Sequence, residues 1–288
     1  MRVVVISDLN GSYGSTDYAG TVHSAIAAII QLKPDVVIST GDMVAGQRRP
    51  ALSADEVGRM WQGFHEAVTS PLEAAGIPFL VTPGNHDASA YRGFARERMI
   101  YREQWKDRAP SGVSGDWPFA YAVDFGGIRF VSLDATTVGA LPADQMRWLE
   151  SLQDDGGLTV AFSHLPLHPI AQDRETEIIG DPELARIFDT IGADLHLTGH
   201  HHAFYVGSAD GIAFVAQSCL GGGARSLIGS QARSGKGFTV IDVVDGQLQV
   251  VGLGGSDFAP ITLSSLPQRI GQLTRLDLLP TQTVVPQQ

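Results

Sequence analysis

Cysteine is almost absent from this chain, since Cys219 is the only one among 288 residues. A single cysteine excludes both an internal disulfide bond and a cluster of thiolate metal ligands. Any metal ion bound by this chain must therefore be held by histidine, aspartate, asparagine or glutamate side chains.

Positive charge is scarce as well. The sequence has 20 Lys and Arg residues against 31 Asp and Glu residues, a formal net charge of −11, and no block rich in Lys or Arg. Proteins that bind nucleic acids or membrane surfaces through charge usually carry a basic face, so we expect neither partner. The acidic excess fits a solvated acidic surface, which is common, or in part a set of metal-binding carboxylates.

Long hydrophobic runs are also missing. Hydrophobic residues make up 43% of the chain, enough for a sizeable core, but no run approaches the length of a membrane-spanning helix. Residues 1–7 lead directly into a strand pattern and lack the apolar core and cleavage site of a signal peptide. We expect a cytoplasmic protein, although a chain trimmed of its leader would look the same.

The first part of the chain alternates between strand and helix patterns. Ser53 and Glu56 have the spacing of a capping box at the start of the second helix. Strands that alternate with helices predict a parallel arrangement with helices on the faces of the sheet. The segments are the strands 2–7, 36–39 and 79–82 and the helices 21–32 and 53–75.

Further elements follow up to about residue 259. Residues 212–217 and 237–244 are expected to be antiparallel strands around the glycine-rich stretch 221–223. Residues 88–117 are either a helical excursion that shapes a substrate pocket or a packed surface helix and loop. With no repeat or linker, we expect one domain over 1–259 and a tail or strap over 260–288. The remaining elements are hairpin strands 119–124 and 128–134 around Gly126-Gly127, helices 142–152 and 182–191, and strands 158–162 and 194–197.

Five hydrophobic runs end in residues of the kind that bind metal ions. Because parallel strands place their carboxyl ends at one edge of a sheet, these side chains can meet although they are far apart in sequence. Oxygen and imidazole donors without sulfur suit Zn, Mn, Fe or Co. Two ions roughly 3.5–4 Å apart, bridged by a carboxylate, would use about this many ligands and can clamp a phosphoryl group. The residues are Asp8 with Asn10, Asp42, Asn85 with His86, His164, and His200 with His202.

In their order these blocks resemble the calcineurin-like metallophosphoesterase superfamily, particularly its cyclic-nucleotide-phosphodiesterase-like bacterial branch. The family pattern is D-x-H, G-D, G-N-H-D/E, a single His, and G-H-x-H. The resemblance implies an α/β fold, a four-layer sandwich of two mixed β-sheets flanked by helices. The blocks in this chain are Asp8-Leu9-Asn10, Gly41-Asp42, Gly84-Asn85-His86-Asp87, His164 and Gly199-His200-His201-His202.

The resemblance also implies roles for these residues, around two ions of Mn, Fe or Zn. A water or hydroxide between the ions would be the nucleophile. His86 would bind no ion; with Asn85 it would contact the substrate, and it would stabilise the transition state or protonate the leaving oxygen. Asp87 would orient His86 or hold the turn. The first ion would be bound by Asp8 and His202, the second by Asn85, His164 and His200, and Asp42 would bridge both.

One position departs from the family pattern, because Asn10 stands where the family has histidine. An amide oxygen is a weaker and harder ligand than imidazole. The first site would therefore bind its ion less tightly, prefer Mn or Mg-like ions, or rely on water. The other histidines fit ordinary core or surface positions, although two of them, His168 and His201, could border the pocket.

The function that the resemblance implies is metal-dependent hydrolysis of a small-molecule phosphate ester, a diester rather than a monoester. Two alternatives stay open. One is a small-molecule phosphomonoesterase. The other is a non-catalytic scaffold with a metallophosphoesterase-like fold, which only Asn10 favours.

Overall fold

Short strands rich in valine and isoleucine form the centre of the molecule. The computed structural model of the chain describes residues 1–244 and 246–276. In this part six strands form one mixed sheet, in the order β13-β12-β11-β1-β2-β3. Its strands are β1 (Arg2–Ile6), β2 (Val36–Ser39), β3 (Phe79–Val81), β11 (Gly237–Val244), β12 (Gln247–Gly254) and β13 (Ala259–Pro260).

A second mixed sheet lies against the first. Its nine described strands run in the order β14-β15-β9-β10-β8-β7-β6-β5-β4, and neighbours from β6 through β7 and β8 to β10 are parallel. They are β4 (Ser114–Asp116), β5 (Ala120–Phe125), β6 (Ile128–Ser132), β7 (Leu158–Ser163), β8 (Ala193–Thr198), β9 (Tyr205–Ala209), β10 (Ile212–Ala216), β14 (Arg269–Ile270) and β15 (Leu273–Arg275).

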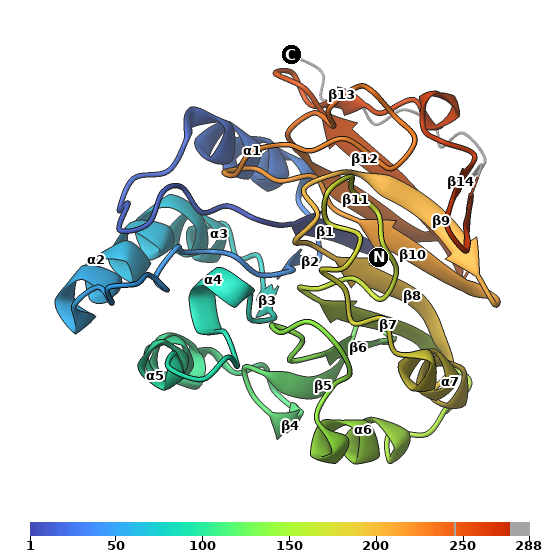
Figure 1. Cartoon of the computed structure of the whole chain (residues 1–288), viewed down its shortest axis with the longest axis horizontal. Coiled ribbons are helices and arrows are strands. Elements are labelled where there is room, and N and C mark those ends of the chain that lie inside the picture. The colour runs from blue at the N-terminus through green and yellow to red at the C-terminus, as the bar shows by residue number, and fades with distance from the viewer. Residues whose placement is uncertain (245, 277–288) are drawn as a thin grey trace.

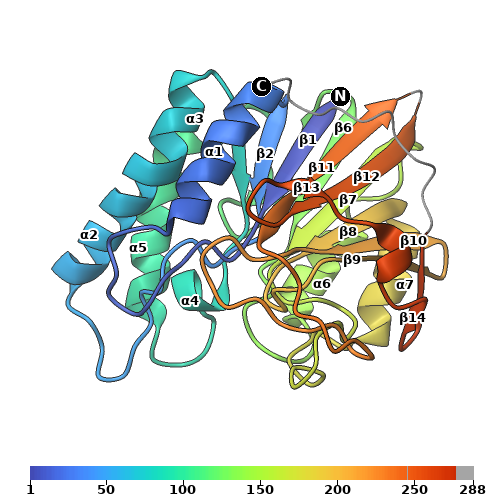
Figure 2. The same cartoon turned by 90° about the horizontal axis from the view of Figure 1, so that it is seen from above.

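Helices cover the outer faces of both sheets. Helices α1, α2 and α3 lie on one side of the paired sheets and α7 on the other (Figure 1), and the view from above shows the four layers in succession (Figure 2). This is the four-layer α/β sandwich expected from the sequence, which is thereby confirmed. The helices are α1 (Gly20–Leu32), α2 (Ala54–Phe64), α3 (Ser70–Ala74), α4 (Asn85–Ala88), α5 (Ala95–Trp105), α6 (Ala143–Glu150) and α7 (Pro182–Thr190).

Three apolar cores separate the four layers. In β1 the side chains alternate, so that Val3 and Val5 enter the core between the sheets while Val4 and Ile6 enter the core under α1 and α2. A strand buried on both faces needs apolar residues at every position, which explains the unbroken hydrophobic run in the sequence. The third core packs α6 and α7 onto the second sheet.

Most predicted elements are found close to their expected bounds. Strands β1, β2 and β3 are parallel, as the alternation of strands and helices predicted. The capping box of Ser53 and Glu56 is present, and the helix after it continues from α2 through a π-helical turn (His65–Thr69) into α3. The hairpin of β5 and β6 turns through Gly126 and Gly127, both of which have positive φ.

One expected strand pairing is wrong. Residues 212–217 and 237–244 do form strands, but β10 belongs to the second sheet and β11 pairs with β1 in the first. For residues 88–117 the sequence allows either a pocket-shaping excursion or a packed helix and loop, and the structure favours packing, because Tyr101 and Trp105 of α5 are buried in the core around Trp61.

The segment after residue 259 continues from the edge of one sheet to the edge of the other. Its β13 pairs with β12, and β15 pairs with β9. Residues 277–288 of the expected tail lie outside the described residues. Among the helices that the structure describes, none has both the length and the apolar character needed to cross a bilayer.

Candidate metal centre

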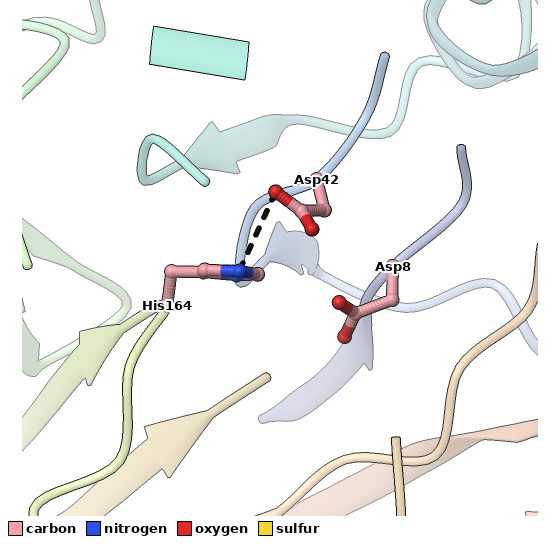
Figure 3. Close-up of side chains that lie close together, drawn as sticks. All are labelled: Asp8, Asp42 and His164. Atoms are coloured by element: carbon pink, nitrogen blue, oxygen red, sulfur yellow. Dashed lines mark ion pairs between the residues drawn. The ribbon is translucent and has the colours of Figure 1, made fainter. Parts of the chain in front are cut away.

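The ends of strands from both sheets meet at one place. Asp8 follows β1 and Asp42 follows β2 in the first sheet, whereas His164 follows β7 in the second. Each of the three offers a ligand atom within 4.8 Å of the others. His164 Nε2 lies 3.4 Å from Asp42 Oδ1, the ion pair drawn in Figure 3. The side chains that the sequence placed on separate strands therefore converge.

The other expected ligands surround this group. His202 Nε2 lies 2.9 Å from Asp8 Oδ1. On the other side, His164 Nε2 lies 2.8 Å from Asn85 Oδ1 and 3.2 Å from His200 Nδ1. This separates the residues into two neighbouring sets, one around Asp8 and one around His164, with Asp42 beside the second.

A cavity of about 420 Å³ opens above the buried side chains. Asn10 lies in its lining, with only 8% of its surface exposed. Its backbone N–H donates to Asp42 O over 3.0 Å, and among the described residues its side-chain amide has no hydrogen bond. The amide is therefore free to act as a ligand. The expected site residues in the lining are Asn10, Asp42, Asn85, His86, His200 and His202.

One buried oxygen indicates that these residues suit a metal ion. Asp8 is fully buried, and among the described residues its Oδ1 has a charged partner only in His202, whose Nε2 lies 2.9 Å away. A buried carboxylate needs a cation beside it, which can be the protonated His202 ring or a metal ion bound by the same side chains. Its other oxygen accepts hydrogen bonds from Ser7 Oγ over 2.5 Å and from the His200 N–H over 3.1 Å.

The charges of the centre hold its carboxylates ionised. Burial opposes ionisation, but His164 and His86 outweigh it and lower the pKa of Asp42. In the same way, burial opposes protonation of His164 and His202. The nearby carboxylates Asp42 and Asp8 nevertheless raise the pKa of these histidines to about 9 and about 11, respectively. Without a metal ion, protons on these two rings balance the negative charge.

The backbone at the centre adopts an unusual conformation. Asp8, Asp42, His200 and His202 have φ of 51°, 56°, 62° and 50°, in the left-handed region that most residues avoid. These four make up nearly half of the nine non-glycine residues with positive φ in the described part. Such strain costs roughly 1–3 kcal/mol per residue and clusters at functional sites.

Several residues support the centre without a signal in the sequence pattern. Thr40 Oγ1 donates to Ser7 Oγ over 2.7 Å, and Ser7 in turn donates to Asp8. Glu177 accepts from His200, and it lies in the long loop between β7 and α7, well past the end of the strand. The loop residues Tyr13, Arg174, Glu177 and Arg225 also line the cavity.

Other residues have structural contacts. Asp87 accepts hydrogen bonds from the N–H groups of Val44 and Gly84, so it holds two turns together, and no contact of its side chain with the His86 ring is found among the described residues. Burial and the charge of Asp42 raise the pKa of Asp87 to about 8. His201 accepts from the N–H groups of residues 170 and 171.

The chain thus combines an α/β sandwich fold with a cluster of oxygen and imidazole donors that could hold a metal ion. A family model described as calcineurin-like phosphoesterase matches residues 1–204, and the chain belongs to that family. The narrower resemblance to a cyclic-nucleotide-phosphodiesterase-like branch stays a prediction.

The chain is similar to two purple acid phosphatases of Arabidopsis thaliana. It is 27% identical to purple acid phosphatase 18 over 66% of this chain and 43% of that protein. It is 25% identical to purple acid phosphatase 15 over 70% of this chain and 40% of that protein. The chain thus spans less than half the length of these curated relatives.

Solved structures share the fold. A purple acid phosphatase from yellow lupin (Lupinus luteus) seeds superposes with a TM-score of 0.66 at 17% identity, over 91% of this chain and 52% of that chain. A dimetal phosphatase from Danio rerio gives 0.60 at 15% identity, over 88% and 96%. GAP50, the anchor in the inner membrane complex of Plasmodium, gives 0.62 at 12% identity, over 96% and 90%.

The close approach of two loops gives a first testable prediction. A Cβ atom on Gly84 would lie 2.1 Å from Asp42 N and 2.2 Å from Asp42 Oδ1. We expect Gly84→Ala to displace the Asp42 carboxylate and to lower the metal content of the purified protein, measured by elemental analysis. Gly58→Ala, in open space on α2, is the control and should leave the metal content unchanged. Full metal content in the Gly84 variant would show that Asp42 tolerates displacement.

The raised pKa values of His164 and His202 give a second prediction. Both rings are positively charged at pH 7 in the metal-free protein, with a proton on each ring nitrogen, because pH 7 lies below their pKa values of about 9 and about 11. A ring nitrogen must lose its proton before it binds a metal ion, so we expect binding to release protons and the affinity to rise from pH 6 to pH 9. Calorimetry in buffers of different ionisation enthalpy measures the protons released. An affinity that stays flat over this range would contradict the assignment of these ligands.

Proposed function

We propose that the chain hydrolyses phosphate esters with a pair of metal ions. The observation that supports this best is the convergence of two buried carboxylates and a buried histidine, Asp8, Asp42 and His164, directly beneath a cavity. Carboxylate, amide and imidazole donors suit Mn, Fe or Zn. The proposed ligands are Asp8, Asn10 and His202 for the first ion, Asn85, His164 and His200 for the second, and Asp42 for both.

The charge of the cavity wall supports an anionic substrate. Arg174 and Arg225 both line the cavity of a chain whose net charge is −11. Burial and the charge of Arg174 lower the pKa of Arg225. Guanidinium groups in the lining of one cavity favour a phosphate group there, because its oxygens accept the hydrogen bonds that they donate.

His86 is the proposed catalytic residue. Its backbone N–H donates to Asp42 Oδ1 over 2.8 Å, and its Nε2 lies 3.9 Å from Asp42 Oδ2, so the ring is held beside the proposed bridging ligand. The ring of Tyr13 packs against it with centroids 5.3 Å apart. From this position a proton on Nε2 can pass to the alcohol oxygen that leaves as the phosphorus–oxygen bond breaks.

The metal pair supplies the rest of the chemistry. When bound, two such ions activate water as a nucleophile and neutralise charge on the phosphoryl oxygens. Asn85 and His86 are proposed to orient the phosphoryl group at the cavity floor. The cavity of about 420 Å³ has room for a small-molecule ester.

The class of ester has two candidates. We propose a phosphodiester as the substrate, from the resemblance of the motifs to a phosphodiesterase branch. A phosphomonoester is the second candidate, and it is favoured by the names of the two Arabidopsis relatives, which are phosphatases. A binding scaffold is a third reading, because GAP50, described as an anchor, has the same fold.

A screen of substrates with added metals tests the proposed function. We expect two equivalents of transition metal per chain and turnover of a chromogenic phosphodiester that a chelator abolishes and Mn restores. Faster turnover of a chromogenic monoester than of the diester would select the second candidate. Metal-free protein that hydrolyses neither ester after metal addition would favour the scaffold.

The role of His86 has its own test. Because His86 is proposed to act on the leaving oxygen and to bind no ion, we expect His86→Ala to lower kcat by about 10²–10⁴-fold while the metal content stays near that of the unchanged protein. His23→Ala replaces an exposed histidine of α1 and is the control for both measurements. Loss of both metals from the His86 variant would mean that this residue is a ligand.

A further inference from the structure

Two histidines of the centre are oriented by backbone carbonyl groups. His164 Nδ1 donates to Thr40 O over 2.9 Å, and His202 Nδ1 donates to Gly223 O over 2.9 Å. A carbonyl oxygen can only accept, so Nδ1 of each ring carries a proton whether or not Nε2 is also protonated. Nε2 of each ring therefore faces the carboxylates of Asp42 and Asp8.

His200 is oriented in the opposite sense, and by a side chain. Its Nε2 lies 2.9 Å from Glu177 Oε2, while its Nδ1 lies 3.2 Å from His164 Nε2. Because a carboxylate accepts, the proton of His200 lies on Nε2, and the lone pair of Nδ1 faces the centre. His164 and His202 are held by backbone carbonyl groups, whereas the tautomer of His200 depends on a side chain, which a substitution can remove.

Glu177 is itself held in place. Arg174 forms an ion pair with Glu177 Oε1, and the backbone N–H of Glu177 donates to Arg174 O over 2.9 Å. Glu177 O also lies 3.1 Å from His201 Nε2 and accepts its hydrogen bond. One oxygen of the Glu177 carboxylate is therefore fixed by Arg174, and the other accepts the hydrogen bond from His200 Nε2.

The backbone of His200 is fixed independently of Glu177. Its N–H donates to Asp8 Oδ2 over 3.1 Å, and its carbonyl accepts from Arg225 Nη1 over 2.6 Å. What these bonds leave undetermined is the rotation of the imidazole ring and the position of its proton. The hydrogen bond to Glu177 determines both.

We propose that Glu177 is a positioning residue that presents His200 Nδ1 to the second metal ion. The proposal rests on the proposed function only in that it requires a metal-binding centre. A carboxylate that accepts the outer N–H of a metal-binding histidine fixes the ring and makes the inner nitrogen a stronger donor. Replacing such a partner typically weakens metal binding by about 10- to 100-fold.

The test compares metal affinities in the absence of substrate. We expect Glu177→Ala to weaken binding of one of the two Zn²⁺ ions by about 10- to 100-fold, measured by competition with a chromophoric chelator, while the other affinity stays within about twofold. Glu175→Ala is the matched control, because Glu175 is an exposed glutamate of the same loop, and it should leave both affinities unchanged.

A second variant guards against a folding defect. Glu177→Gln keeps an oxygen that can accept the hydrogen bond from His200 but loses the negative charge. We therefore expect its Zn²⁺ affinity to lie between those of Glu177→Ala and the unchanged protein. Circular dichroism and thermal unfolding show whether each variant folds. Zn²⁺ affinities of Glu177→Ala and Glu177→Gln that both lie within about twofold of the unchanged protein would overturn the proposal.

The outcomes also separate this proposal from the proposed function. Two bound ions without hydrolysis of any ester would remove the proposed function and leave the effect of Glu177 measurable. Normal hydrolysis with unchanged affinities in the Glu177 variants would remove only the role of Glu177. A protein that binds no metal ion at all would overturn both.

Discussion

The centre depends on two carboxylates buried next to each other. Asp8 and Asp42 are almost completely inaccessible to solvent and remain ionised, because the neighbouring histidines outweigh the cost of burial. Their ligand atoms lie within 4.8 Å of each other, and two like charges that close repel strongly in a low-dielectric interior. The arrangement is therefore stable only when cations, either protons on His164 and His202 or metal ions, lie between the sheets.

The fold holds the two buried carboxylates in place because the strands that precede them are packed between apolar cores. Four candidate ligands have left-handed backbone conformations, which persist only where the surrounding structure over-determines them. The β1 strand provides such support, since its residues alternate between two cores. The hydrogen-bond chain from Thr40 through Ser7 to Asp8 then fixes the carboxylate that leaves β1.

Much of the fold and of the candidate site could be predicted because each element carried a local signal. Runs such as residues 36–38 are apolar at every position, and the ligand-type residue follows shortly after the strand ends. Pairing carried no such signal, since nothing local to residues 212–217 and 237–244 shows that they belong to different sheets. Glu177 could not be predicted either, because its contact with His200 joins a loop without periodicity to a distant strand end.

The origin of the ligands has a consequence for the molecule as a whole. Asp8, Asp42 and Asn85 follow strands of one sheet, and His164, His200 and His202 follow strands of the other. A cation bound by residues of both groups would link the two sheets of the sandwich directly. Filling a site at about 100 times its dissociation constant adds about 2.7 kcal/mol to folding stability. If the proposed ions bind, the resistance of this protein to heat is expected to depend on the supply of metal around it.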